Sequence, residues 1–138
     1  MSENLQDLKT EWQILHNNYE DYEKYSLLFK LSGVAVCLVY LTTIVHVFPA
    51  LCLLILLWLS EAIWKTFQSR IGDRLVLLED VLHGDAKHKS FNLYSQWFGQ
   101  RPAIDALVKQ YLNSALRPTV VFPHIFFALL VIVSAILY

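Results

Sequence analysis

The sequence predicts an all-α membrane protein with three transmembrane helices, a tight hairpin plus a C-terminal span, and a cytoplasmic antiparallel helical stalk. Residues 31–60 and 119–138 contain no Asp, Glu, Lys or Arg, and uncharged apolar stretches of this length are typical of membrane spans. The composition agrees, because 56% of the 138 residues are hydrophobic, whereas about 45 to 50% is usual in globular proteins. The net charge of −1 creates no strong overall field, so a nucleic-acid partner is not expected.

The uncharged stretch 31–60 is too long for a single span. As one helix it would be about 45 Å long, but the hydrocarbon core of a bilayer is only about 30 Å thick. Pro49 lacks a backbone donor and disfavours helical geometry at the preceding residue, so we expect the chain to turn at residues 46–49. The predicted bounds are 27–67 for the hairpin domain, 27–46 for its first span and 49–67 for its second.

Residues 1–26 are predicted to form a cytoplasmic amphipathic helix. Its apolar positions are separated by alternating steps of three and four residues: Leu5, Leu8, Trp12, Leu15, Tyr19 and Tyr22. This heptad spacing predicts a helix that runs without a break into the first span, in the manner of a coiled coil. The start of the chain is polar and acidic, unlike a signal peptide, so we expect the N-terminus to be retained inside.

Residues 68–118 are predicted to form a cytoplasmic helical region. The second span continues as one helix to about Leu82 with Gly84 as its cap, and its apolar positions again step by three and four: Trp64, Phe67, Ile71, Leu75, Leu78 and Leu82. A short aromatic helix at 91–98 and a helix over 102–116 follow. We expect the latter to complete the stalk, with a place among the lipid headgroups as the alternative. Two stalk helices alone leave apolar surface in water, which favours a homo-oligomer or a protein partner.

Residues 119–138 are predicted to be the third span, with a kink at Pro123. The eleven basic residues all lie on one side of the predicted membrane: Lys9, Lys24, Lys30, Lys65, Arg70, Arg74, Lys87, Lys89, Arg101, Lys109 and Arg117. By the positive-inside rule the N-terminus and the region before the third span are cytoplasmic, and Tyr138 is outside. This layout is common among small bacterial membrane proteins, so we expect the inner (plasma) membrane.

Glu61 is the main candidate for a functional site. It lies twelve residues after Pro49, about 18 Å along the second span by helix rise, where a carboxylate is costly in hydrocarbon. Its candidate partners are Lys65 at i+4, Lys30 at the inner end of the first span, and His124 in the third span. Two interpretations follow: an intrahelical pair with Lys65 that marks the interface, or a proton, ion or ligand site shared with His124.

A second candidate is a metal site near Gly84. Acidic and imidazole side chains gather there: Glu79, Asp80, His83, Asp85 and His88. Asp80 and His83 share a helix face at i, i+3 and could present two ligands to one ion. No known zinc spacing appears, however, and a solvated loop attracts the same residue types.

The two cysteines, Cys37 and Cys52, lie at different depths in the hairpin, so we expect them to be free thiols that pack in apolar surroundings. The sequence contains no glycine-rich phosphate loop, nucleophile elbow or HExxH motif, so neither a cofactor nor an enzymatic activity is indicated.

Two function classes remain. The first is a self-associating scaffold or accessory subunit that docks a membrane or cytoplasmic protein through its stalk. The second is a homo-oligomeric ion or proton channel, or a pore-type effector, with Glu61 and His124 near the path. A membrane enzyme that acts on lipid is a third, less specific possibility.

Overall fold

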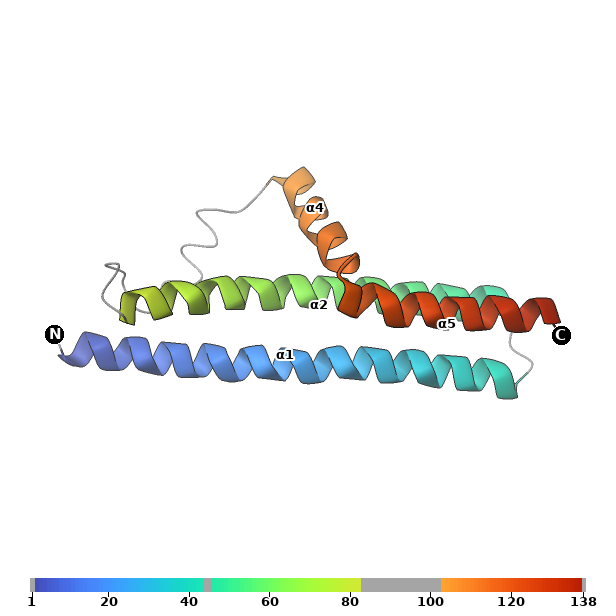
Figure 1. The fold of residues 1–138 in the computed structure, drawn as a ribbon, viewed down its shortest axis with the longest axis horizontal. Helices are drawn as coiled ribbons and strands as arrows, with labels where there is room; N and C mark the ends of the chain where they lie inside the picture. The colour runs from blue at the N-terminus through green and yellow to red at the C-terminus, as the bar shows by residue number, and fades with distance from the viewer. Residues whose placement is uncertain (1, 44–45, 83–102, 138) are drawn as a thin grey trace.

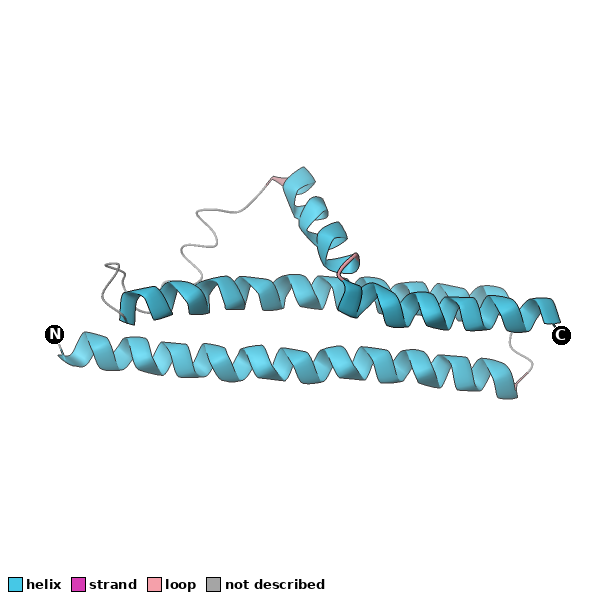
Figure 2. Ribbon diagram, viewed as in Figure 1, coloured by secondary structure: helices cyan, strands magenta, loops and turns pink. Residues whose placement is uncertain are grey.

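The computed structural model describes residues 2–43, 46–82 and 103–137. The secondary structure of these residues is helical apart from short connections, and none of them lies in a β-strand (Figure 2). The all-α class predicted from the sequence is therefore confirmed for the described part of the chain.

Four helices make up the described structure: α1 (Ser2–Thr42), α2 (Val47–Leu82), α4 (Ile104–Ala115) and α5 (Pro118–Leu137). Three of them, α1, α2 and α5, are long and apolar enough to cross a membrane. Helices of this length and composition indicate an integral membrane protein, and their number agrees with the sequence prediction.

Helices α1 and α2 run antiparallel along most of their length, and α5 lies against the half that is nearer the hairpin turn (Figure 1). By helix rise, α1 is about 62 Å long, α2 about 54 Å and α5 about 30 Å. Both hairpin helices therefore extend well past α5. We call this two-helix extension, residues 2–25 and 68–82, the stalk, and the three-helix part the span bundle.

The hairpin helices are continuous, as their periodicity predicts. Helix α1 runs through the expected boundary between the amphipathic segment and the first span, and α2 runs without a break to Leu82. The proposed cap Gly84, the loop that follows it and the aromatic segment 91–98 lie outside the described residues.

The turn of the hairpin lies earlier than expected. Helix α1 ends at Thr42 and α2 begins at Val47, so the predicted turn at 46–49 is wrong and Pro49 is the third residue of α2. The first turn of a helix has backbone N–H groups without intrahelical acceptors, so a proline there sacrifices no hydrogen bond. At the other side of the turn, Thr42 Oγ1 donates to the Leu38 carbonyl at 2.8 Å.

The core is divided between the stalk and the span bundle. In the stalk, one cluster joins α1 to α2: Leu8, Leu15, Leu75 and Leu78, with Trp12, Tyr19 and Ile71 packed against it. In the span bundle, a second cluster joins all three helices: Cys37, Ala50, Leu54 and Val131, with Val36, Tyr40 and Phe127 beside it. In the predicted apolar stripe of α1, the two leucines of the stalk cluster are buried and the aromatic residues are half-buried. Leu5 is 46% exposed, and the charged Glu11 is buried.

Helix α4 was expected to complete the stalk, and it contacts the stalk where Arg70 Nη2 donates to Gln110 Oε1 at 3.3 Å, but most of it does not pack there. Ser114 and Ala115 are its buried residues, whereas Ile104 at the other end is 82% exposed. Figure 1 shows α4 leaving the bundle obliquely instead of following α2. The apolar face of α4 is therefore left largely uncovered.

Two helix glycines mark close approaches, with different consequences for substitution. A Cβ at Gly33 would lie 2.7 Å from Cε2 of Phe127, whereas one at Gly72 would lie 3.3 Å from Cε2 of Tyr19. Alanine gains about 1 kcal/mol of helix propensity over glycine, but overpacking costs about 1 to 3 kcal/mol. We expect Gly33→Ala to destabilise the protein and Gly72→Ala to be close to neutral.

Equilibrium unfolding of both variants in the same detergent checks this prediction. A Gly33→Ala variant as stable as Gly72→Ala would contradict the close packing of α5 on α1.

Candidate functional site

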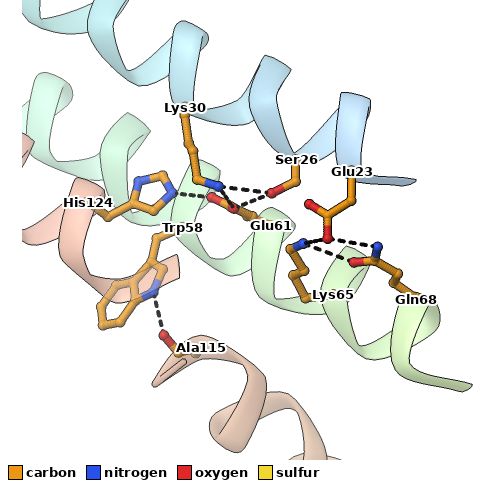
Figure 3. A network of polar contacts seen from close by, with 9 residues as sticks. All are labelled: Glu23, Ser26, Lys30, Trp58, Glu61, Lys65, Gln68, Ala115 and His124. Carbon is orange, nitrogen blue, oxygen red and sulfur yellow. Dashed lines mark hydrogen bonds and ion pairs between the residues drawn. The ribbon is translucent and has the colours of Figure 1, made fainter. Parts of the chain in front are cut away.

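Polar side chains from all three helices of the span bundle converge on Glu61, which is fully buried on α2. Its Oε1 atom accepts a hydrogen bond from Ser26 Oγ at 2.6 Å and lies 3.2 Å from Lys30 Nζ. Its Oε2 atom lies 2.8 Å from Nε2 of His124 (Figure 3). We call Ser26, Lys30, Glu61 and His124 the polar cluster.

Each of the three helices of the span bundle contributes at least one side chain to the polar cluster. Ser26 and Lys30 are one turn apart on α1 and therefore face the same side, and Lys30 Nζ lies 3.2 Å from Ser26 Oγ. His124 follows Pro123 near the start of α5 and is 3% exposed. The His124 ring also packs edge-on against Phe127, whose ring lies over Gly33. The cluster thus holds three helices together at one level.

The charges in the polar cluster balance if the histidine is neutral. Glu61 and Lys30 form an ion pair, and a neutral His124 protonated at Nε2 can donate to the second carboxylate oxygen. A net charge of zero is favoured in a buried site, because isolated charges are costly away from water. Nδ1 of His124 is buried without a hydrogen-bond partner among the described residues, so in this tautomer it is an unused acceptor.

Lys65 does not join Glu61, so the predicted intrahelical pair is not formed. Its Nζ atom instead lies 2.8 Å from Glu23 Oε1 and 2.9 Å from Gln68 Oε1 (Figure 3). Gln68 Nε2 in turn donates to the Tyr19 carbonyl at 3.1 Å. Glu23 of the neighbouring helix α1 and Gln68 on the next turn of α2 thus take the place of Glu61. Lys65 thus belongs to a second polar layer, at the junction between the span bundle and the stalk.

The second layer predicts a modest acid sensitivity. The hydrogen bond from Lys65 lowers the pKa of Glu23 below its ordinary value of 4.5, against the opposing effect of burial. Because the folded-state pKa is the lower one, the stabilisation is complete above the ordinary pKa and is lost as the pH falls through the folded-state pKa. Glu23→Gln should therefore weaken the loss of stability between about pH 5 and 3. The effect should be at most about 1 kcal/mol, since the carboxylate is 57% exposed.

Unfolding titrations at several pH values measure this difference, with Asp7→Asn at an exposed position of α1 as the control. A Glu23→Gln profile that parallels the parent would contradict the role assigned to the Lys65 contact.

A third polar layer lies in the stalk and was not found from the sequence. Nε and Nη2 of Arg74 lie 3.0 and 2.9 Å from Glu11 Oε1, and the two side chains are 3% and 5% exposed. Beside this pair, Trp12 Nε1 donates to Glu79 Oε1 at 3.1 Å. The sequence position of Glu11 could have indicated its burial, because Glu11 lies between Leu8 and Leu15 on the face of α1 that packs against α2.

The second predicted site is largely outside the described residues. Of its proposed ligands, Asp80 is exposed on the last turns of α2, whereas His83, Asp85 and His88 lie in the undescribed segment. Within the described ranges, no group of three or more His, Cys, Asp or Glu side chains could hold a metal ion. Cys37 is buried, Cys52 is half-buried, and both are free thiols.

The three polar layers are compatible with two roles, namely fixing the register of the helices and exchanging a proton. Buried polar groups that require one specific partner fix the register of packed helices, and the layers occur at Glu61, Gln68 and Arg74 along α2. A buried carboxylate next to an imidazole can also exchange a proton. Comparison of the chain with protein-family models, curated proteins and solved structures finds no match for any of the three.

Proposed function

We propose that the protein is a small polytopic membrane protein that self-associates and serves as a scaffold or accessory subunit, docking a partner through its stalk. The observation that carries this proposal is the apolar surface left on the stalk. Its exposed members are Leu5 at 46%, Ile14 at 51%, Val76 at 58% and Leu77 at 42%. Lipid can cover such residues on the spans, but in the stalk they need a protein.

The proposal includes a membrane placement with the N-terminus and stalk in the cytoplasm and the C-terminus outside, in a bacterial inner membrane. The distribution of basic residues supports this orientation. An aromatic group supports the level of the inner boundary: Trp64 stacks on Tyr22 at 4.6 Å and contacts Tyr25 at 5.4 Å between ring centroids. Trp and Tyr are enriched at membrane interfaces, and the Lys65 layer lies at the same level.

Self-association is tested on the whole protein in detergent and in nanodiscs by light scattering. We expect a dimer or larger assembly whose dissociation is promoted by Val76→Lys, because a charge on this apolar surface opposes its burial. Asp73→Lys, at a neighbouring exposed position of α2, is the matched control and should leave the assembly intact. A strictly monomeric protein under all conditions would exclude the self-associating scaffold.

A channel is the second candidate, and one specific observation favours it. Nδ1 of the buried His124 has no partner among the described residues, and Nε2 of the same ring touches Glu61. A proton or an ion-bound water could use this free acceptor.

Reconstitution into liposomes separates the two candidates. Proton or cation flux that disappears in Glu61→Gln would favour the channel over the scaffold. The scaffold would be favoured by two results together. Vesicles that contain the assembled protein show no ion flux, and a partner protein co-purifies with the parent but not with Val76→Lys.

A further inference from the structure

Helix α4 and its C-cap carry a row of exposed apolar side chains. Four residues spaced by four positions form it, with exposed fractions of 82%, 48%, 57% and 64%: Ile104, Val108, Leu112 and Leu116. Side chains at this spacing lie in one row along a helix. We call this row the α4 ridge. A contiguous apolar surface of this kind marks contact with a protein or a membrane.

Hydrogen bonds to α2 hold α4 at the junction of the span bundle and the stalk, and one of them runs from Arg70 Nη2 to Gln110 Oε1 at 3.3 Å. Thr66 Oγ1 and Ser114 Oγ are 2.7 Å apart, and Trp58 Nε1 donates to the Ala115 carbonyl at 3.0 Å (Figure 3). Thr66 is adjacent to Lys65, whose polar layer lies where the span bundle passes into the stalk. The C-terminal end of α4 is therefore held at the inner end of the spans.

From that level, α4 slants away from the bundle and toward the stalk side (Figure 1). The chain passes from α4 directly into the apolar helix α5 at Pro118. A helix that followed α2 would place its apolar face against the stalk, whereas the oblique α4 leaves the four ridge residues exposed. The exposed side chains of Lys109 and Arg117 flank the ridge and suit a surface of anionic headgroups.

We propose that the α4 ridge is a membrane-surface binding site, inserted into the boundary between headgroups and acyl chains of the cytoplasmic leaflet. This inference rests on the membrane placement proposed above. The occupant is the same bilayer that the three spans cross, because α4 is attached at the level where that bilayer ends. The bilayer covers the ridge in place of the stalk or a second copy.

Site-directed spin labels on the full chain in nanodiscs test this inference. Labels are attached to Val108→Cys and Leu112→Cys in a Cys37→Ala, Cys52→Ala background whose helix content matches the parent. Asp105→Cys and Asn113→Cys, each one residue after a ridge residue and at an exposed polar position, are the matched controls. Collision with oxygen, which concentrates in lipid, is compared with collision with a water-soluble nickel chelate. Labels at Leu53→Cys on a span and at Asn17→Cys on the stalk report the membrane placement independently.

The expected result is that labels at 108 and 112 collide severalfold more with oxygen and less with nickel than labels at 105 and 113. Equal nickel access at all four positions, with Leu53→Cys still protected from nickel, would overturn the α4 inference and leave the membrane placement intact. Protection of 108 and 112 from both reagents would show a protein cover and also overturn it. If Leu53→Cys is as open to nickel as Asn17→Cys, the membrane placement itself fails.

Discussion

Glu61→Ala is expected to cost about 3 to 5 kcal/mol of unfolding free energy, the largest effect of any single substitution in the span bundle. The Glu61 carboxylate accepts a hydrogen bond from Ser26, pairs with the ammonium of Lys30 and contacts the imidazole of His124. All three contacts are 3.2 Å or shorter. Without the carboxylate, the Lys30 cation and the polar groups of Ser26 and His124 lose their buried partner. These groups then stay removed from water with no hydrogen bond or ion pair in exchange, which lowers the stability of the folded state. Equilibrium unfolding by steric trapping or by denaturing detergent measures the loss.

The control for Glu61→Ala is Ser60→Ala at the preceding position. Ser60 is exposed, and its hydroxyl donates within α2, to the Leu56 carbonyl at 2.8 Å. Its replacement should change stability by less than about 0.5 kcal/mol, as is usual for surface positions. If both variants lose the same amount, the polar cluster does not hold the helices together.

A double variant distinguishes charge pairing from simple loss of packing. When Lys30→Met accompanies Glu61→Leu, no uncompensated charge is left behind. Replacing both members of a buried ion pair by apolar residues is often neutral. The double variant should therefore lose much less stability than the sum of the two single variants, which is the coupling expected of groups in contact.

Arg74→Met is expected to open the outer part of the stalk, at a cost of about 3 kcal/mol. The guanidinium contacts the Glu11 carboxylate through two nitrogen atoms, and both side chains are at most 5% exposed. Replacing Arg74 with methionine removes the cation that pairs with the buried Glu11 carboxylate. Hydrogen exchange should then accelerate by about 100-fold in the stalk segments 2–25 and 68–82, with little change in the span bundle.

Asp73→Ala is the control for this second prediction, because Asp73 precedes Arg74 but is exposed. Equal exchange in the two variants, or faster exchange spread evenly over stalk and spans, would contradict the localised role of the Glu11–Arg74 layer.

The helices and their continuity followed from the sequence because they depend on local composition and spacing. Uncharged stretches and steps of three and four residues are properties of the chain itself, and they suffice to predict three long helices. The turn was misplaced for a local reason as well, since Pro49 is equally compatible with a turn and with the first turn of a helix.

The site was only partly predictable, because periodicity identifies the buried face of a helix but not the partner that meets it. The sequence indicated Glu61, Lys30 and His124 from their charge and depth alone, and the structure brings these three together. The sequence also suggested Lys65 as a partner of Glu61, but in the structure Lys65 pairs with Glu23 instead.

What the sequence determined by itself was therefore the composition and length of the helices, which fix where apolar surface must be hidden from water. Only the tertiary structure decided which polar groups face one another. A buried ion pair requires two side chains to meet within a few ångströms, and that depends on the axial register of antiparallel helices. The register sets Glu61 against Ser26 and Arg74 against Glu11. The packing of α4 leaves its ridge exposed.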